Sequence, residues 1–71
     1  MHSEIQTVKH RFEELYKQQA AYLASKPTDF LLSLEHEAEE RMNRHETFAE
    51  LVSSKVNHAA CVRILEKRGV K

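Results

Sequence analysis

Only two residues of this 71-residue chain strongly disfavour helix, a proline at position 27 and a glycine at position 69. Proline inside a helix removes a backbone hydrogen bond, and glycine loses more conformational freedom than other residues when it becomes helical. Neither residue occurs between Thr28 and Arg68, so that stretch can form helix without interruption. We therefore predict an all-α fold, either a small antiparallel helical hairpin or a three-helix bundle.

The first predicted helix covers about residues 4–24. Ser3 followed by Gln6 forms a capping box, in which each side chain satisfies a backbone N–H group left free at the helix start. Pro27 ends the helix, since the residue before a proline avoids the helical conformation. Apolar side chains recur every three or four residues, the spacing of a buried helix face or a coiled-coil seam. They are Ile5, Val8, Phe12, Leu15 and Tyr22, and the polar Gln19 occupies the same stripe.

The second predicted helix covers about residues 28–43. Thr28 or Ser25 is suited to cap its N-terminus, and Pro27 fits a first helical turn. Asp29 places negative charge near the positive end of the helix dipole. We expect this helix to bury one face, which is formed by Phe30, Leu31, Leu34, Ala38 and Met42.

The third predicted helix covers about residues 47–68 and ends at Gly69. Thr47 followed by Glu50 forms another capping box, and Asn43 is suited to the left-handed conformation of a helix C-cap. These signals predict a break between the second and third helices. Because the junction holds neither Gly nor Pro, one continuous or kinked helix is the alternative. The apolar face of the third helix is formed by Phe48, Leu51, Val52, Val56, Ala59 and Val62.

The composition argues against several classes of protein. One cysteine cannot form a disulfide within the chain, which favours a reducing compartment, and we expect a cytoplasmic protein. No apolar run approaches the roughly 20 residues that span a bilayer, so we expect no membrane partner. No glycine-rich phosphate loop, nucleophile motif or zinc-ligand spacing occurs. We therefore expect no enzymatic activity, no cofactor and no small-molecule substrate, and we interpret the histidines at positions 2, 10, 36, 45 and 58 as surface residues rather than metal ligands.

Charges are separated along the chain, although 11 basic and 11 acidic residues balance overall. Asp29–Glu50 holds seven acidic residues against two basic ones, and Lys55–Lys71 holds five basic residues against one acidic residue. Such segments attract each other as neighbouring antiparallel helices of one chain, or between two copies of it. As an alternative function, the basic segment predicts a small nucleic-acid-binding regulator. Its candidate phosphate contacts are Lys55, Arg63, Lys67 and Arg68.

The stretch Ala59–Leu65 is apolar on almost every side of a helix. Such a helix is buried on more than one side, between two helices of its own chain or against another chain. Residues 1–71 are expected to form a single small domain, and a domain this short buries only about 60% of the surface of its unfolded chain. We therefore predict a non-enzymatic interaction module, a small adaptor, chaperone or regulatory subunit, that buries helix faces against a protein partner or a second copy. Its predicted interface is Ala60, Cys61, Ile64 and Leu65.

In size and in its unpartnered apolar helix surface, the chain resembles the small co-chaperones of bacterial type III secretion needles and the small four-helix-bundle dimers of plasmids and phages. The resemblance is one of architecture, and the local match is limited to Pro27, Phe30 and Leu34 at the start of the second helix. It implies a co-chaperone-like protein of a secretion system as a further alternative. No residue role is carried over from these groups.

Overall fold

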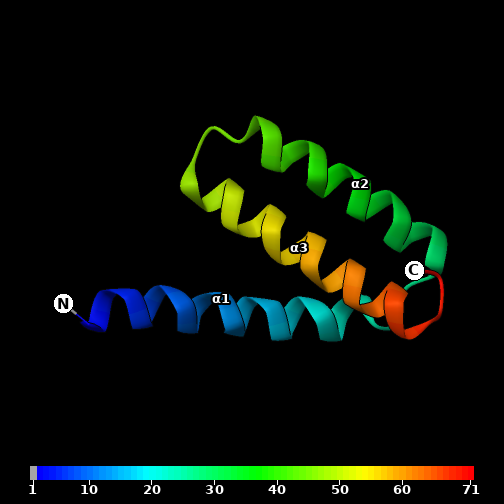
Figure 1. Cartoon of the computed structure of the whole chain (residues 1–71), viewed down its shortest axis with the longest axis horizontal. Helices are drawn as coiled ribbons and strands as arrows, with labels where there is room; N and C mark the ends of the chain where they lie inside the picture. The colour runs from blue at the N-terminus through cyan, green and yellow to red at the C-terminus, as the bar shows by residue number, and fades with distance from the viewer. Residues whose placement is uncertain (1) are drawn as a thin grey trace.

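The chain folds into three helices, one of which lies between the other two. The computed structural model describes the backbone of residues 2–71 and the side chains of residues 9–71. Its helices are α1 (His2–Leu23), α2 (Thr28–Arg44) and α3 (Phe48–Lys67). α2 and α3 form an antiparallel hairpin, and α1 converges with α3 towards the C-terminal ends of both (Figure 1). The predicted all-α fold is confirmed, in its three-helix form.

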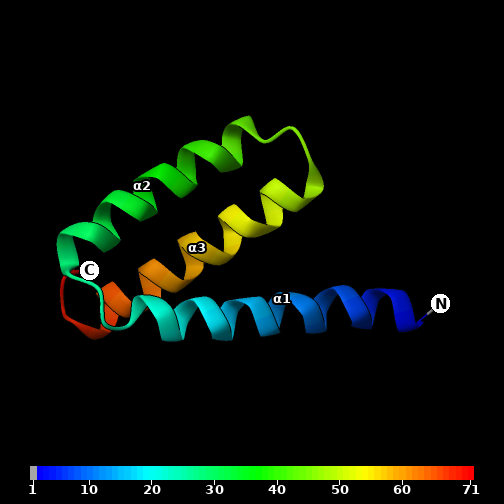
Figure 2. The same cartoon turned by 180° about the vertical axis from the view of Figure 1, so that it is seen from behind.

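The helix α3 lies between the other two. It packs against α2 on one side and α1 on the other, while α1 and α2 contact each other only marginally. The view from behind shows the same order (Figure 2). A cluster of buried side chains joins the three helices and consists of Leu23, Leu31, Ala60, Cys61 and Leu65. The two-sided apolar character of α3 is therefore explained by two neighbours within its own chain.

The junction between α1 and α2 differs from the predicted capping. Pro27 is the N-cap residue, its backbone is extended, and no side-chain hydrogen bond caps α2. The first helical bond runs from the amide of Leu31 to the carbonyl of Pro27, over 3.1 Å. Neither Ser25 nor Thr28 caps this helix, because the Thr28 hydroxyl instead accepts a hydrogen bond from Arg68 at 3.1 Å.

The predicted break between α2 and α3 is confirmed, and the continuous helix is wrong. The Thr47 hydroxyl caps α3 by accepting a hydrogen bond from the Glu50 amide at 3.1 Å. The Glu50 carboxylate in turn accepts from the Glu46 amide at 3.0 Å, one residue earlier than a standard capping box requires. Asn43 does not form a left-handed cap: α2 continues to Arg44, and its C-cap residue has extended backbone.

Gly69 ends α3 as predicted. Its φ of +77° lies in the left-handed region, which glycine enters without steric cost. The amide of Val70 donates to the carbonyl of Leu65 at 3.0 Å, and the amide of Gly69 donates to the carbonyl of Glu66 at 3.1 Å. This pair of bonds is a Schellman motif. At the other end of the chain, the predicted Ser3–Gln6 capping box lies outside the described side chains.

The Thr47 cap gives a direct test of the α2–α3 break. Thr47→Ala is expected to lower the free energy of unfolding by about 1 kcal/mol, because the Glu50 amide loses its acceptor. Urea denaturation followed by circular dichroism measures the change. Thr47→Ser keeps the hydroxyl and is the matched control. Equal stability of the alanine variant and the parent chain would mean that the cap does not contribute.

Candidate functional site

The four residues predicted to face a partner lie inside the chain's own core. Ala60, Cys61 and Leu65 have no solvent-exposed surface, and Ile64 is partly buried against them. They pack with side chains from both α1 and α2. In this fold Ala60, Cys61 and Leu65 offer no surface to a second protein, and Ile64 offers only part of its side chain.

The buried thiol of Cys61 is suited to packing rather than to chemistry. Burial, followed by the nearby charge of Glu35, raises the pKa of the Cys61 thiol from 9.0 to about 11. Glu35 is itself buried, and one of its oxygens lies 2.7 Å from the ammonium nitrogen of Lys71. A reactive cysteine needs an exposed thiolate. Cys61 therefore has neither the charge nor the access of a nucleophile near neutral pH.

The basic end of the chain is partly used within the molecule. Arg68 donates hydrogen bonds to the hydroxyl of Thr28 and to the carbonyls of Ala24 and Lys26, over 3.1, 3.0 and 2.7 Å. We call this group of three bonds the Arg68 clasp. It holds the end of α3 on the connection between α1 and α2, and it uses three of the five N–H donors of the Arg68 guanidinium. The other three candidate phosphate contacts, Lys55, Arg63 and Lys67, are exposed on α3.

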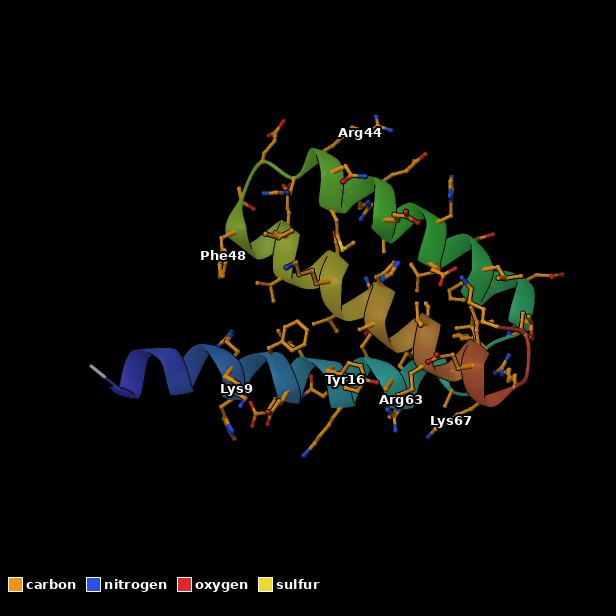
Figure 3. All side chains as sticks on the ribbon, in the orientation of Figure 1. Lys9, Tyr16, Arg44, Phe48, Arg63 and Lys67 are labelled. Carbon is orange, nitrogen blue, oxygen red and sulfur yellow. The ribbon has the colours of Figure 1, made fainter. Side chains whose placement is uncertain are left out.

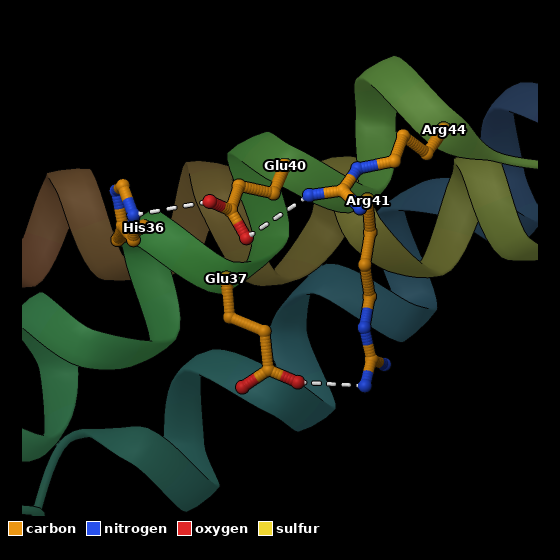
Figure 4. A network of polar contacts seen from close by, with 5 residues as sticks. All are labelled: His36, Glu37, Glu40, Arg41 and Arg44. Atoms are coloured by element: carbon orange, nitrogen blue, oxygen red, sulfur yellow. Dashed lines mark ion pairs between the residues drawn. The ribbon is translucent and has the colours of Figure 1, made fainter.

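Charged side chains along α2 form ion pairs within that helix. Glu40 contacts both His36 at 3.3 Å and Arg44 at 3.6 Å, and Glu37 contacts Arg41 at 2.6 Å (Figure 4). Several of these residues line a polar cleft between α2 and α3. In residues 9–71 no three His, Cys, Asp or Glu side chains come together in an arrangement that would hold a metal ion. Two carboxylates of α2, those of Glu37 and Glu40, thus have an arginine partner within the helix.

An apolar groove of about 520 Å³ lies between α1 and the N-terminal half of α3. We call it the α1–α3 groove. Its apolar walls are Phe12 and Leu15 from α1 and Phe48, Ala49, Val52 and Val56 from α3. Its polar edges are Arg11, Gln18, Gln19, Ser53 and Asn57. The groove exists because α1 and α3 diverge towards their N-terminal ends (Figures 1 and 2).

The most exposed apolar side chain of this groove is Phe48, at 67%. Figure 3 shows it pointing outward from the first turn of α3. Leu15 on the opposite wall is 37% exposed. The sequence placed both residues on faces expected to be buried, and the structure corrects this because the diverging helices leave them without a neighbour. The sequence feature that indicates unpartnered apolar surface is the apolar stripe of α1. This stripe continues towards the N-terminus beyond the part of α1 that packs against α3.

Two other exposed aromatic side chains have a local partner. Tyr22 is 56% exposed and Phe30 is 43% exposed. The ammonium nitrogen of Lys26 lies 4.6 Å from the Tyr22 ring centre and 5.6 Å from the Phe30 ring centre. Cation–π contacts of this kind are modestly stabilising at exposed sites. The rings of Tyr22 and Phe30 therefore each have a cationic neighbour within the chain. No cation–π contact is found for Phe48 among the described side chains.

Within residues 2–71, no helix has both the length and the apolar character needed to cross a lipid bilayer. No protein-family model, curated protein sequence or solved structure matches this chain.

Proposed function

We propose that this chain is a non-enzymatic protein-interaction module that binds a partner helix in the α1–α3 groove. The proposal moves the interaction surface from Ala60, Cys61, Ile64 and Leu65 to the groove walls. Amphipathic helices commonly bind by laying an apolar face into such a groove. We also propose a cytoplasmic setting, which fits the single free cysteine.

The observation that carries the proposal is the exposure of large apolar side chains on both walls of the groove. Phe48 on the α3 wall is 67% exposed, and Leu15 on the α1 wall is 37% exposed. Exposed apolar surface gathered in a concave site is typical of interaction sites.

The nucleic-acid alternative gains no comparable support. Of its four candidate contacts, Arg68 is held by three acceptors of its own chain. Lys71, a further cation of the same segment, pairs with Glu35. The interaction module is therefore the function that we propose.

A photo-crosslinking amino acid at position 48 tests this proposal in the native host. We expect it to cross-link a polypeptide, identified by mass spectrometry, because the side chain at that position lies at the edge of the groove. The same amino acid at Ser33, an exposed position on α2, is the control and should not capture that polypeptide. Adding Leu15→Asp, which places a charge on the opposite groove wall, should reduce the yield at position 48 at least fivefold, about 1 kcal/mol. Equal yields at positions 48 and 33, or a yield insensitive to Leu15→Asp, would contradict the proposal.

A further inference from the structure

The walls of the α1–α3 groove have the length of a short helix. On α1 the lining residues extend from Arg11 to Gln19, and on α3 they extend from Phe48 to Asn57. At 1.5 Å per residue, these walls are about 12 and 14 Å long. Side chains at positions i, i+4 and i+7 of a partner helix lie on one face and span about 10 Å. A helix laid lengthwise in the groove can therefore place three apolar side chains between the two walls.

The α1 edge of the groove carries a positive charge. Arg11 is the only charged residue among those that line the groove, and it forms no ion pair with the side chains of residues 9–71. Helical spacing places Arg11 on the same side of α1 as Leu15 and Gln18. Glu14 lies on the other side of α1 and contacts His10 at 3.4 Å. No described carboxylate of the protein therefore pairs with the Arg11 guanidinium.

The α3 edge of the groove is polar but uncharged, and it is formed by Ser53 and Asn57. Glu50, one turn before Ser53, lines instead the cleft between α2 and α3. Its carboxylate accepts a hydrogen bond from the Glu46 amide. The groove thus presents one cation at its α1 edge and no carboxylate among its described lining residues. Charges of this kind at the rim of an interface select partners of opposite charge and fix how the partners lie.

We infer that the occupant of the α1–α3 groove is an amphipathic helix of another protein that is acidic on one flank. Apolar residues at i, i+4 and i+7 of this helix fill the groove, and an aspartate or glutamate beside them pairs with Arg11. The inference rests on the proposed function, because it names the chemistry of the helix that binds in the same groove.

The position of Arg11 also gives the bound helix a direction. Arg11 is the first lining residue of the α1 wall and Phe48 is the first of the α3 wall, so both lie at the end where α1 and α3 diverge (Figure 1). The acidic residue of the partner lies at this wide end. A lysine or arginine in its place is repelled by Arg11, and such repulsion excludes wrong partners and reversed orientations.

Charge reversal at Arg11 tests the inference with the photo-crosslinking amino acid at position 48. Arg11→Glu should reduce the yield of the captured polypeptide about fivefold, because a repulsive exposed pair replaces an attractive one. Lys17 is exposed on the side of α1 away from the groove, so Lys17→Glu should leave the yield unchanged. Circular dichroism checks that both variants stay helical. Mass spectrometry should assign the cross-link to a segment with the i, i+4, i+7 apolar pattern and an acidic residue within one turn of it.

A synthetic peptide of the captured segment allows a charge swap. Replacing its acidic residue by arginine should weaken its binding to the parent chain about fivefold, as measured by fluorescence anisotropy. The same peptide should bind the Arg11→Glu variant with close to the parent affinity. Rescue by the paired change shows that the two side chains interact, which an indirect effect of Arg11→Glu on the fold would not produce.

Several results would overturn the inference. They are a captured segment without an acidic residue, a peptide swap without rescue, or a cross-link between two copies of this chain. A yield that falls with Leu15→Asp but not with Arg11→Glu would leave the groove as an interaction site and refute only the acidic flank of its partner. A yield insensitive to both changes would refute the proposed function as well.

Discussion

Leu65→Ala is expected to lower the free energy of unfolding by about 3 kcal/mol, the typical cost of a cavity in place of a buried leucine. Leu65 has no exposed surface and packs against Leu23 of α1 and Leu31 of α2 within one buried cluster. Its removal therefore weakens both helix contacts of α3 at once. Small domains have little stability to spare, so we expect the variant to be substantially unfolded at 37 °C. Urea denaturation at a fixed protein concentration measures the difference.

Phe48→Ala is the matched control for that experiment. It removes a larger side chain from the same helix, but at a position that is 67% exposed. Under conditions where the chain is monomeric, we expect its free energy of unfolding to stay within about 0.5 kcal/mol of the parent value. A loss below about 1 kcal/mol for Leu65→Ala, or a larger loss for Phe48→Ala, would contradict the placement of α3 between α1 and α2.

The free energy of unfolding is expected to fall at alkaline pH because of Cys61. The ordinary pKa of a cysteine thiol is 9.0, and in the folded chain the pKa of Cys61 is about 11. Burial is the larger cause of this rise, and the charge of Glu35 is the smaller one. The folded chain thus binds the thiol proton more tightly than the unfolded chain does. The contribution is fully present below pH 9 and is lost as the pH rises towards 11, by about 2–3 kcal/mol in total.

Cys61→Ala isolates this contribution from the lysines and tyrosines that titrate in the same range. Urea denaturation at pH 8 and pH 10.5 gives the loss of stability for each chain, and the parent should lose more than the variant by on the order of 2 kcal/mol. The alanine variant will be less stable at both pH values, but only its dependence on pH matters. Equal losses for the two chains would mean that the thiol is not buried in the folded state.

Local chemistry is sufficient to predict two of the helix boundaries, the start of α3 at Thr47 and its end at Gly69. Thr47 offers a hydroxyl three residues before an available amide, and Gly69 adopts a φ that other residues avoid, so both boundaries follow from single residues and their neighbours. Thr28 shows the limit of this reasoning. Its hydroxyl is used by Arg68, forty residues further along the chain, and no local pattern indicates such a partner.

The candidate site is harder to predict. The spacing of apolar residues shows which face of a helix is buried, but it does not show which helix or molecule covers that face. The apolar stretch that includes Ala60 and Leu65 was correctly recognised as buried on two sides. Whether the second neighbour is another helix of the chain or another molecule depends on the angle at which α1 crosses α3. The same angle exposes Phe48, which the sequence places on an apolar face with Val52. The angle at which two helices diverge cannot be read from the pattern of residues in one sequence.

The Arg68 clasp has a consequence for the thermodynamics of binding. One guanidinium is bonded to two carbonyls of the connection that follows α1 and to the first residue of α2, so it restrains the direction in which α1 leaves the hairpin. The walls of the α1–α3 groove are then set before any partner arrives. Preorganised surfaces lose less conformational entropy on association than flexible ones. We therefore expect the clasp, although remote from the groove, to lower the entropic cost of the proposed binding.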